Sequence, residues 1–258
     1  MPRFAANLTM LFGEMPVMDR FAAAKAAGFR GVEYLFPYDF EKAELQEQLQ
    51  QHDLALVLHN LPAGNWAGGE RGIACLPGRE DEFKAGVAQA IAYANMLECD
   101  RVNCLAGIPP EGVEPSVARA TFVKNLQYAA PLLKAAGIRL LIEPLNTRDV
   151  PGFFLTGTRQ AIEIIEAVGS DNLSLQFDLY HMQIMEPPVA ATIERELPRI
   201  GHMQLADVPG RHEPGTGEMD YPSLLSLIDR LGYTGWIGCE YVPTAKTVDG
   251  LAWTKPYL

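Results

Sequence analysis

Four side chains that carry oxygen atoms stand at matching places in four short apolar runs of the second half of the chain. The runs read LLIE, LQFD, HMQLAD and WIGCE. Three acids brought together in a dry pocket would repel one another, and a bound cation commonly balances them. Carboxylate and amide oxygens suit a hard divalent ion, with Mg²⁺ preferred and Mn²⁺ second, better than Zn²⁺. The sequence therefore predicts one metal site, with the ligands Glu143, Asp178, Gln204 and Glu240.

Alternation along a strand gives these residues a common direction. Side chains point to opposite faces in turn, so each oxygen ligand shares its face with the residue two positions before it. Ile142, directly before Glu143, and Cys239, directly before Glu240, then point the other way. This pattern places apolar side chains against a helix layer and the oxygen ligands in the mouth of a barrel.

Three histidines lie close to these runs. His181 follows Asp178 by three residues, and we expect it to contact the substrate or to polarise a neighbouring group. His202 precedes Gln204 by two residues, which predicts a hydrogen-bonded core histidine one layer deeper. His59 ends an earlier strand and is a further candidate for substrate contact, with a packing role as the alternative.

The elements that position these residues alternate from end to end of the chain. Runs rich in β-formers predict eight strands, at Phe4–Leu8, Gly31–Leu35, Ala55–His59, Arg101–Leu105, Arg139–Glu143, Ser174–Asp178, His202–Leu205 and Trp236–Tyr241. Apolar residues at helical spacing predict helices near 16–27, 41–51, 80–98, 116–136, 157–168, 189–198 and 221–231. We expect a single (β/α)8 TIM barrel over residues 1–258, because eight parallel strands close into one barrel.

An open doubly wound sheet is the alternative fold. It would normally carry a glycine-rich nucleotide loop after the first strand, whereas TMLFGEMPVMD has a single glycine. Two long loops, 60–79 and 206–220, follow predicted strands. They lie at the strand ends where barrels carry their active sites. These features favour the barrel.

Composition limits the partners. The net charge of −11 argues against nucleic acid, whose phosphates are bound mainly by Lys and Arg. No segment approaches the roughly 20 apolar residues that span a bilayer, and the N-terminal run lacks the features of a signal peptide. Four cysteines without a C-x-x-C pair are expected to be reduced packing residues. We therefore expect a cytoplasmic enzyme that acts on a small molecule.

Several segments resemble the hydroxypyruvate isomerase family of the xylose-isomerase-like barrels. They include LHNLPAGNWAGGERGIACLPGREDEF, IEPLN, PGFFLTGTRQA, QFDLYHMQ, GHMQLADVPGRHEPGTGEMDY and GWIGCEY, and the resemblance covers nearly the whole chain. It implies interconversion of hydroxypyruvate and tartronate semialdehyde with a divalent metal, Glu143 and Glu240 handling the proton. The same four ligands are implied. Sugar epimerases of this superfamily usually have His where this chain has Gln204, so their substrates are not carried over.

A keto-acid substrate adds one requirement. Its carboxylate needs a cation, and the guanidinium of an arginine fits a carboxylate best. Arg71 and Arg211, one in each long loop, are the candidates, with Arg148 weaker. Trp66 would cap the pocket and exclude water, or it simply packs within its loop.

Three other functions stay open. A 2-oxo-tetronate isomerase, or another sugar or sugar-acid isomerase or epimerase, would use the same residues. A metal-dependent phosphodiesterase on this barrel would need many His ligands, and the chain has five His in all. A binding module without activity would not need all three acids. Homo-oligomers are a further expectation, because Leu251, Trp253 and Tyr257 are apolar residues expected on the surface.

Overall fold

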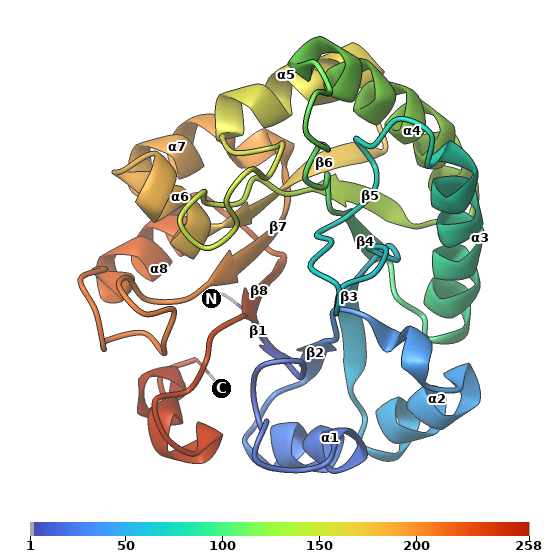
Figure 1. The fold of residues 1–258 in the computed structure, drawn as a ribbon. Coiled ribbons are helices and arrows are strands. Elements are labelled where there is room, and N and C mark those ends of the chain that lie inside the picture. Colours follow the sequence, from blue (N-terminus) through green and yellow to red (C-terminus); the bar gives the residue numbers. More distant parts are fainter. Residues whose placement is uncertain (1–2, 258) are drawn as a thin grey trace.

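The computed structural model describes residues 3–257 and closes eight parallel strands into a barrel, in chain order (Figure 1). The strands are β1 (Arg3–Asn7), β2 (Gly31–Glu33), β3 (Ala55–Asn60), β4 (Arg101–Cys104), β5 (Arg139–Ile142), β6 (Leu173–Asp178), β7 (Ile200–Leu205) and β8 (Trp236–Cys239). β8 pairs with β1 as well as with β7, which closes the ring. The predicted fold and all eight predicted strands are confirmed, with ends that differ by one or two residues.

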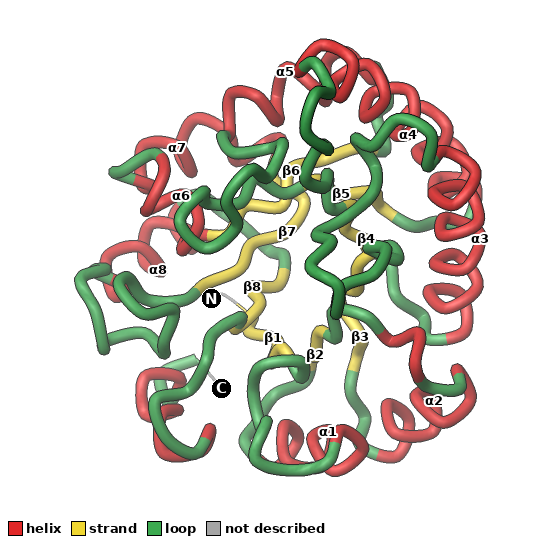
Figure 2. The backbone as a smooth tube through the Cα atoms, in the orientation of Figure 1, coloured by secondary structure: helices red, strands yellow, loops and turns green. Residues whose placement is uncertain are grey.

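Helices form a ring outside the strands (Figure 2). They are α1 (Val17–Ala26), α2 (Lys42–Gln51), α3 (Glu80–Met96), α4 (Pro115–Ala135), α5 (Thr158–Val168), α6 (Leu179–Met185), α7 (Val189–Glu196) and α8 (Tyr221–Arg230). Three short 3-10 helices complete the elements, η1 (Pro37–Asp39), η2 (Leu197–Arg199) and η3 (Thr247–Thr254). The seven predicted helices are confirmed, whereas α6 was not predicted. η3 follows β8 and fills the last place of the ring, between α8 and α1 (Figure 1).

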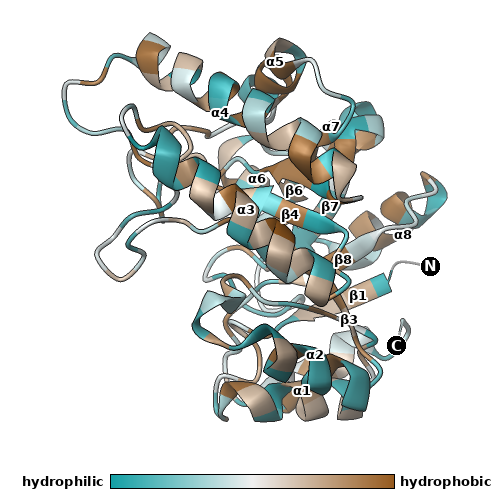
Figure 3. Cartoon of the chain, turned by 90° about the vertical axis from the view of Figure 1, so that its right-hand side faces the viewer, coloured by the Kyte–Doolittle hydropathy of each residue, from teal (hydrophilic) through white to brown (hydrophobic). Residues whose placement is uncertain are grey.

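Burial separates the two faces of the strands as the alternation predicts. Leu141 packs inside the barrel with Ala5 and Val57. Ile142 and Cys239 belong to the larger core between strands and helices. Hydrophobic and hydrophilic residues alternate along α3 in Figure 3, and the buried members of that helix include Phe83 and Val87. The polar side chains at the ends of the strands are therefore carried by a barrel that is packed on both sides.

The end of the chain packs onto the first strand. The ring of Phe4 lies 5.1 Å from that of Trp253 and 5.4 Å from that of Tyr257, centre to centre. Leu251 is 9% exposed. The expectation that these apolar residues are free on the surface is wrong, because Leu251 is buried and the rings of Trp253 and Tyr257 pack on Phe4 of the first strand. They therefore give no support to self-association.

The four cysteines are free and buried. Burial raises the pKa of Cys75 and Cys99 to about 12, so these thiols stay protonated. They act as packing residues, as predicted. Among the described residues, no helix is long and apolar enough to cross a membrane.

Candidate active site

Three buried acids meet at the carboxyl end of the barrel. Asp178 is the last residue of β6, while Glu143 and Glu240 directly follow β5 and β8. Gln204 pairs with Asp178 in the β6–β7 register, which brings it to the same level. All four side chains are at most 6% exposed. The strand ends thus gather the four predicted ligands at one place.

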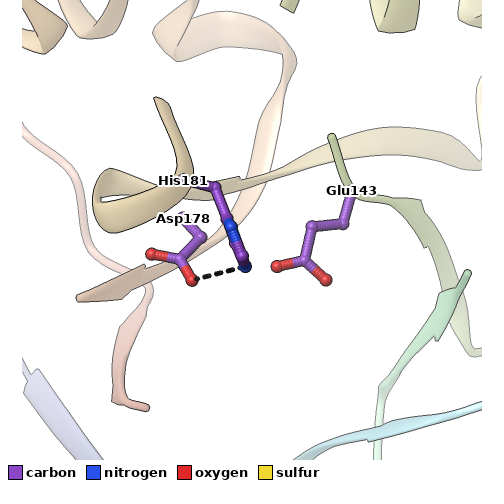
Figure 4. Close-up of side chains that lie close together, drawn as sticks. All are labelled: Glu143, Asp178 and His181. Atoms are coloured by element: carbon purple, nitrogen blue, oxygen red, sulfur yellow. Dashed lines mark ion pairs between the residues drawn. The ribbon is translucent and has the colours of Figure 1, made fainter. Parts of the chain in front are cut away.

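Glu143, Asp178 and His181 form the tightest group, and each offers one polar atom within 4.8 Å of the others (Figure 4). The backbone N–H of Asn146 donates to His181 Nδ1 at 3.2 Å. A neutral imidazole that accepts at Nδ1 carries its proton on Nε2. His181 Nε2 lies 3.6 Å from Asp178 Oδ2, so His181 presents a donor to this group. Burial lowers the pKa of His181 well below its usual value, which keeps the ring neutral.

Asp178 uses its two oxygens differently. Asp178 Oδ1 accepts the N–H of Tyr180 at 2.8 Å and so caps α6. Asp178 Oδ2 is buried without a hydrogen bond. A buried carboxylate oxygen without a partner is costly, and a cation would satisfy it. The carboxylates of Asp178 and Glu143, whose oxygens lie within 4.8 Å of each other, therefore fit a divalent metal ion.

Burial and neighbouring negative charge raise the pKa of all three acids. Burial, followed by the charges of Glu240 and Asp178, raises the pKa of Glu143 well above its usual value. Burial raises the pKa of Asp178 to about 6 and that of Glu240 to about 8, although Arg211 opposes both shifts. Acids that hold protons near neutral pH are suited to proton transfer.

Arg211 reaches into this acidic group from the loop after β7. The guanidinium nitrogen Nη2 of Arg211 lies 2.6 Å from Glu240 Oε1 and 3.7 Å from Asp178 Oδ2. Its guanidinium also lies over the ring of Tyr180, 5.2 Å from the ring centre. One of the two candidate arginines is thus placed among the predicted ligands.

Gln204 turns its amide nitrogen toward the acids. Gln204 Nε2 donates to Glu240 Oε2, and to Glu33 Oε2 at 2.9 Å. Gln204 Oε1 accepts from Gln176 Nε2 at 2.6 Å. In this orientation Gln204 holds Glu240 in place and offers no oxygen to a metal. The ligand role predicted for Gln204 requires the amide to be turned over.

His59, which was predicted to contact the substrate, lies apart from the acids. His59 Nδ1 lies 3.2 Å from Tyr38 Oη, and burial lowers the pKa of His59 to about 4. Asn60, the next residue along the strand, bonds the Asn103 side chain beside Glu143, so alternation turns His59 away from that group.

Trp66 and Arg71 pack on each other in the first long loop. The Arg71 guanidinium lies 4.2 Å from the centre of the Trp66 ring, and Arg71 NH1 donates to the carbonyl of Trp66 at 3.1 Å. Trp66 also lies 4.8 Å from the ring of Phe36 and is 40% exposed. The contacts between Arg71 and Trp66 lie within the loop, the contact with Phe36 joins the loop to the segment after β2, and none of them joins Arg71 to the acids.

Sequence reasoning missed several polar residues on the earlier strands. Asn103 on β4 donates to Glu143 Oε2 at 2.9 Å. Asn7 ends β1, and Glu33 ends β2; both are buried beside Gln204. The predicted strands run on to Leu8 and Leu35, so Asn7 and Glu33 do not stand at predicted strand ends, whereas β1 and β2 end at these two residues. His202 was predicted as a hydrogen-bonded core residue, and its contact with Glu33 confirms this.

Comparison with known proteins places this geometry in a family. The hydroxypyruvate isomerase of Escherichia coli strain K12 is 53% identical over 257 residues, covering 100% of both chains. The 2-oxo-tetronate isomerase of Cupriavidus necator is 50% identical over 258 residues, covering 100% of this chain and 99% of the relative. A crystal structure from Brucella melitensis, described as an AP endonuclease of family 2, matches with a TM-score of 0.97 at 47% identity, covering 100% of this chain and 99% of the other. A family model matches residues 21–257, and the chain belongs to the xylose isomerase-like TIM barrel family.

Proposed function

We propose that this chain is a hydroxypyruvate isomerase that converts hydroxypyruvate and tartronate semialdehyde into each other. Relatives that match along their whole length carry the names hydroxypyruvate isomerase and 2-oxo-tetronate isomerase. The higher identity belongs to the former, and the two activities differ in the length of the substrate. Isomerisation of 2-oxo-tetronate is the second candidate.

The reaction needs a proton to be moved between neighbouring carbons. One proton leaves C3 of hydroxypyruvate, an enediolate forms, and a proton is returned to C2, while the proton on the C3 oxygen passes to the C2 oxygen. A bound divalent metal, Mg²⁺ first and Mn²⁺ second, supplies charge that stabilises the negative oxygens. We propose Glu143, Asp178 and Glu240 as its carboxylate ligands; Gln204, predicted as a fourth, keeps its amide nitrogen on Glu33 and Glu240 and orients Glu240 instead.

The protein groups supply the rest of the chemistry. Glu143 and Glu240 act as the base and the acid, because each is buried and each has a raised pKa. His181 presents the N–H on Nε2 to a substrate oxygen. Arg211 reaches the same place and binds the substrate carboxylate.

The observation that carries the proposal is the meeting of three buried acids, one of which keeps an oxygen without a hydrogen bond. A fold that used these residues only for stability would gain little from burying three carboxylates around a single arginine. A site for a metal and a mobile proton needs that arrangement.

A substrate panel tests the proposal. The protein is incubated with hydroxypyruvate, or with 2-oxo-tetronate, in the presence of Mg²⁺, Mn²⁺ or EDTA, and products are followed by NMR. We expect hydroxypyruvate to turn over with the higher kcat/KM, and Glu143→Gln and Glu240→Gln each to lower kcat by about 10²–10⁴-fold. Glu196 is a buried glutamate of α7 that pairs with Arg195 and Arg199, and Glu196→Gln serves as the matched control. Equal turnover by both site variants and the wild type would contradict the roles given to these acids.

A further inference from the structure

One buried carboxylate near the site has no part in the proposed reaction. Glu33 ends β2 and is fully enclosed in the barrel. Glu33 Oε1 lies 2.5 Å from His202 Nε2. Glu33 Oε2 accepts from Asn7 Nδ2 at 3.2 Å and from Gln204 Nε2 at 2.9 Å. Each oxygen of Glu33 is thus held by groups on other strands.

The two amides that bind Glu33 also bind Glu240. Asn7 Nδ2 lies 3.4 Å from Glu240 Oε2, and Gln204 Nε2 donates to the same oxygen. Each amide therefore bridges a deep carboxylate and the carboxylate that handles the proton. The orientation of Glu240 depends on where Glu33 holds these two nitrogens.

Gly238 makes the room for this arrangement. A Cβ atom at Gly238 would lie 2.1 Å from Glu33 Oε1 and 2.4 Å from its Cδ. The φ angle of Gly238 lies outside the left-handed region, so its backbone does not require glycine. The glycine is needed for space, because any side chain there would push the Glu33 carboxylate away from its partners.

Filling this space with apolar residues would be the simpler way to build a barrel. Ala5 and Leu141 fill the neighbouring interior without any charge. A buried carboxylate loses its hydration at a cost of several kcal/mol, which its hydrogen bonds must offset. We propose that Glu33 and His202 form a positioning pair: His202 fixes Glu33, and Glu33 fixes Glu240 through the amides of Asn7 and Gln204. This role rests on the proposed function insofar as Glu240 moves the proton.

Glu33→Gln tests the pair with little change of shape. The new amide places an NH2 group where one carboxylate oxygen of Glu33 stood. This donor then faces either His202 Nε2 or the amide nitrogens of Asn7 and Gln204, which donated to that oxygen. We expect kcat for hydroxypyruvate to fall by about 10–100-fold with KM within about threefold, and the Kd for Mn²⁺, measured by calorimetry, to rise about tenfold. The control Glu196→Gln should leave both unchanged. A purely structural role would lower the melting temperature and leave kcat and the Mn²⁺ Kd of the folded protein unchanged.

Gly238→Ala provides the second arm and keeps Glu33 intact. The added methyl group should displace the carboxylate and reproduce the losses of kcat and Mn²⁺ affinity. In a Glu33→Ala background the same methyl group should cause no further loss, because no carboxylate remains to be displaced. The proposal would be overturned if Gly238→Ala kept the wild-type kcat and Mn²⁺ Kd. It would also be overturned if adding Gly238→Ala to Glu33→Ala lowered kcat and Mn²⁺ affinity further. If the wild type does not isomerise hydroxypyruvate, the proposed function fails, while Mn²⁺ affinity still decides the role of Glu33.

Discussion

The carboxylate of Glu240 is held from two sides. Arg211 NH2 lies 2.6 Å from its Oε1, while Asn7 and Gln204 bind its Oε2. A carboxylate held by donors on both oxygens has one orientation, which the proposed proton transfer would need. At the scale of residues, the site combines three acids with one arginine, and the arginine has two tasks. It lowers the repulsion among the acids, and we infer that it also binds the substrate.

Arg211 and Arg71 should differ in their effect on substrate binding. Arg211→Lys keeps the charge but loses the planar fork, and we expect it to raise KM for hydroxypyruvate about 10–100-fold, which corresponds to the loss of a hydrogen bond between charged groups. Arg71→Lys should raise KM less than threefold, because Arg71 packs on Trp66. Steady-state kinetics of the two variants decide between them. A larger effect at Arg71 would move the substrate carboxylate to the first long loop.

At the scale of elements, the loop after β7 is organised by one buried acid. Asp207 accepts the backbone N–H groups of Val208 at 2.8 Å, Gly215 at 2.8 Å, Gly217 at 2.9 Å and Met219 at 3.1 Å. Arg211 belongs to this loop, and its own N–H bonds the Asp207 carbonyl at 3.1 Å. The fixed loop is what carries the arginine to the acids.

Asp207→Ala should loosen the loop and weaken substrate binding together. The loss of bonds to a buried carboxylate is expected to lower the free energy of unfolding by about 2–3 kcal/mol and to speed hydrogen exchange over residues 208–219. KM should rise with it, because Arg211 loses its position. Asp220→Ala is the matched control. It removes the cap of α8, where the Asp220 side chain accepts from Ser223, and should cost about 1 kcal/mol with KM unchanged. Unchanged exchange over 208–219 in Asp207→Ala would contradict this account.

The same elements show what sequence can and cannot predict. Strand ends and the inward direction of Glu143, Asp178 and Glu240 follow from alternation, because a strand has a period of two. α6 was missed because it is short and its first four residues, from Leu179 to Met182, are all buried, which removes the polar face that marks a helix. The amide direction of Gln204 was also out of reach, since it depends on hydrogen bonds to Glu33, Gln176 and Glu240, which come from three other strands.

At the scale of the whole molecule, closure of the barrel brings together acids that lie far apart in the chain. Glu33 on β2 and Asp178 on β6 come from opposite sides of the ring, and Glu240 follows β8 (Figure 1). Burying these charges without a cation opposes folding, as the raised pKa of Asp178 and Glu240 shows. The expectations of a cytoplasmic location and of homo-oligomers stay predictions.

The stability of the metal-free protein should therefore fall as pH rises from about 7 to about 8. In this range the unfolded acids are ionised, whereas Glu240, whose pKa burial raises to about 8, still holds its proton in much of the folded protein. The folded state then binds more protons, and each retained proton costs about 1.4 kcal/mol of stability per pH unit. His59 and His181 do not oppose this, because burial lowers the pKa of both rings and above about pH 7 they are mostly neutral when unfolded as well.

Thermal unfolding in EDTA and in Mg²⁺ measures this effect. We expect the melting temperature to fall across this range in EDTA, and to change less in Mg²⁺, which stabilises the ionised acids. The fall in EDTA should be smaller in Glu240→Gln, which has one acid fewer. A melting temperature in EDTA that rises with pH over the same range would contradict the raised pKa of these acids.

The central claim is that Glu143 and Glu240 move a proton between two carbons of a small keto acid. The most direct measurement follows hydroxypyruvate by NMR in D2O with Mg²⁺ present. We expect tartronate semialdehyde with deuterium at C2, because the carboxylates exchange their protons with solvent, and we expect it to form about 10²–10⁴-fold more slowly with Glu143→Gln or Glu240→Gln. Conversion with complete retention of the original hydrogen at C2 would contradict it, since that result requires transfer without an exchangeable base.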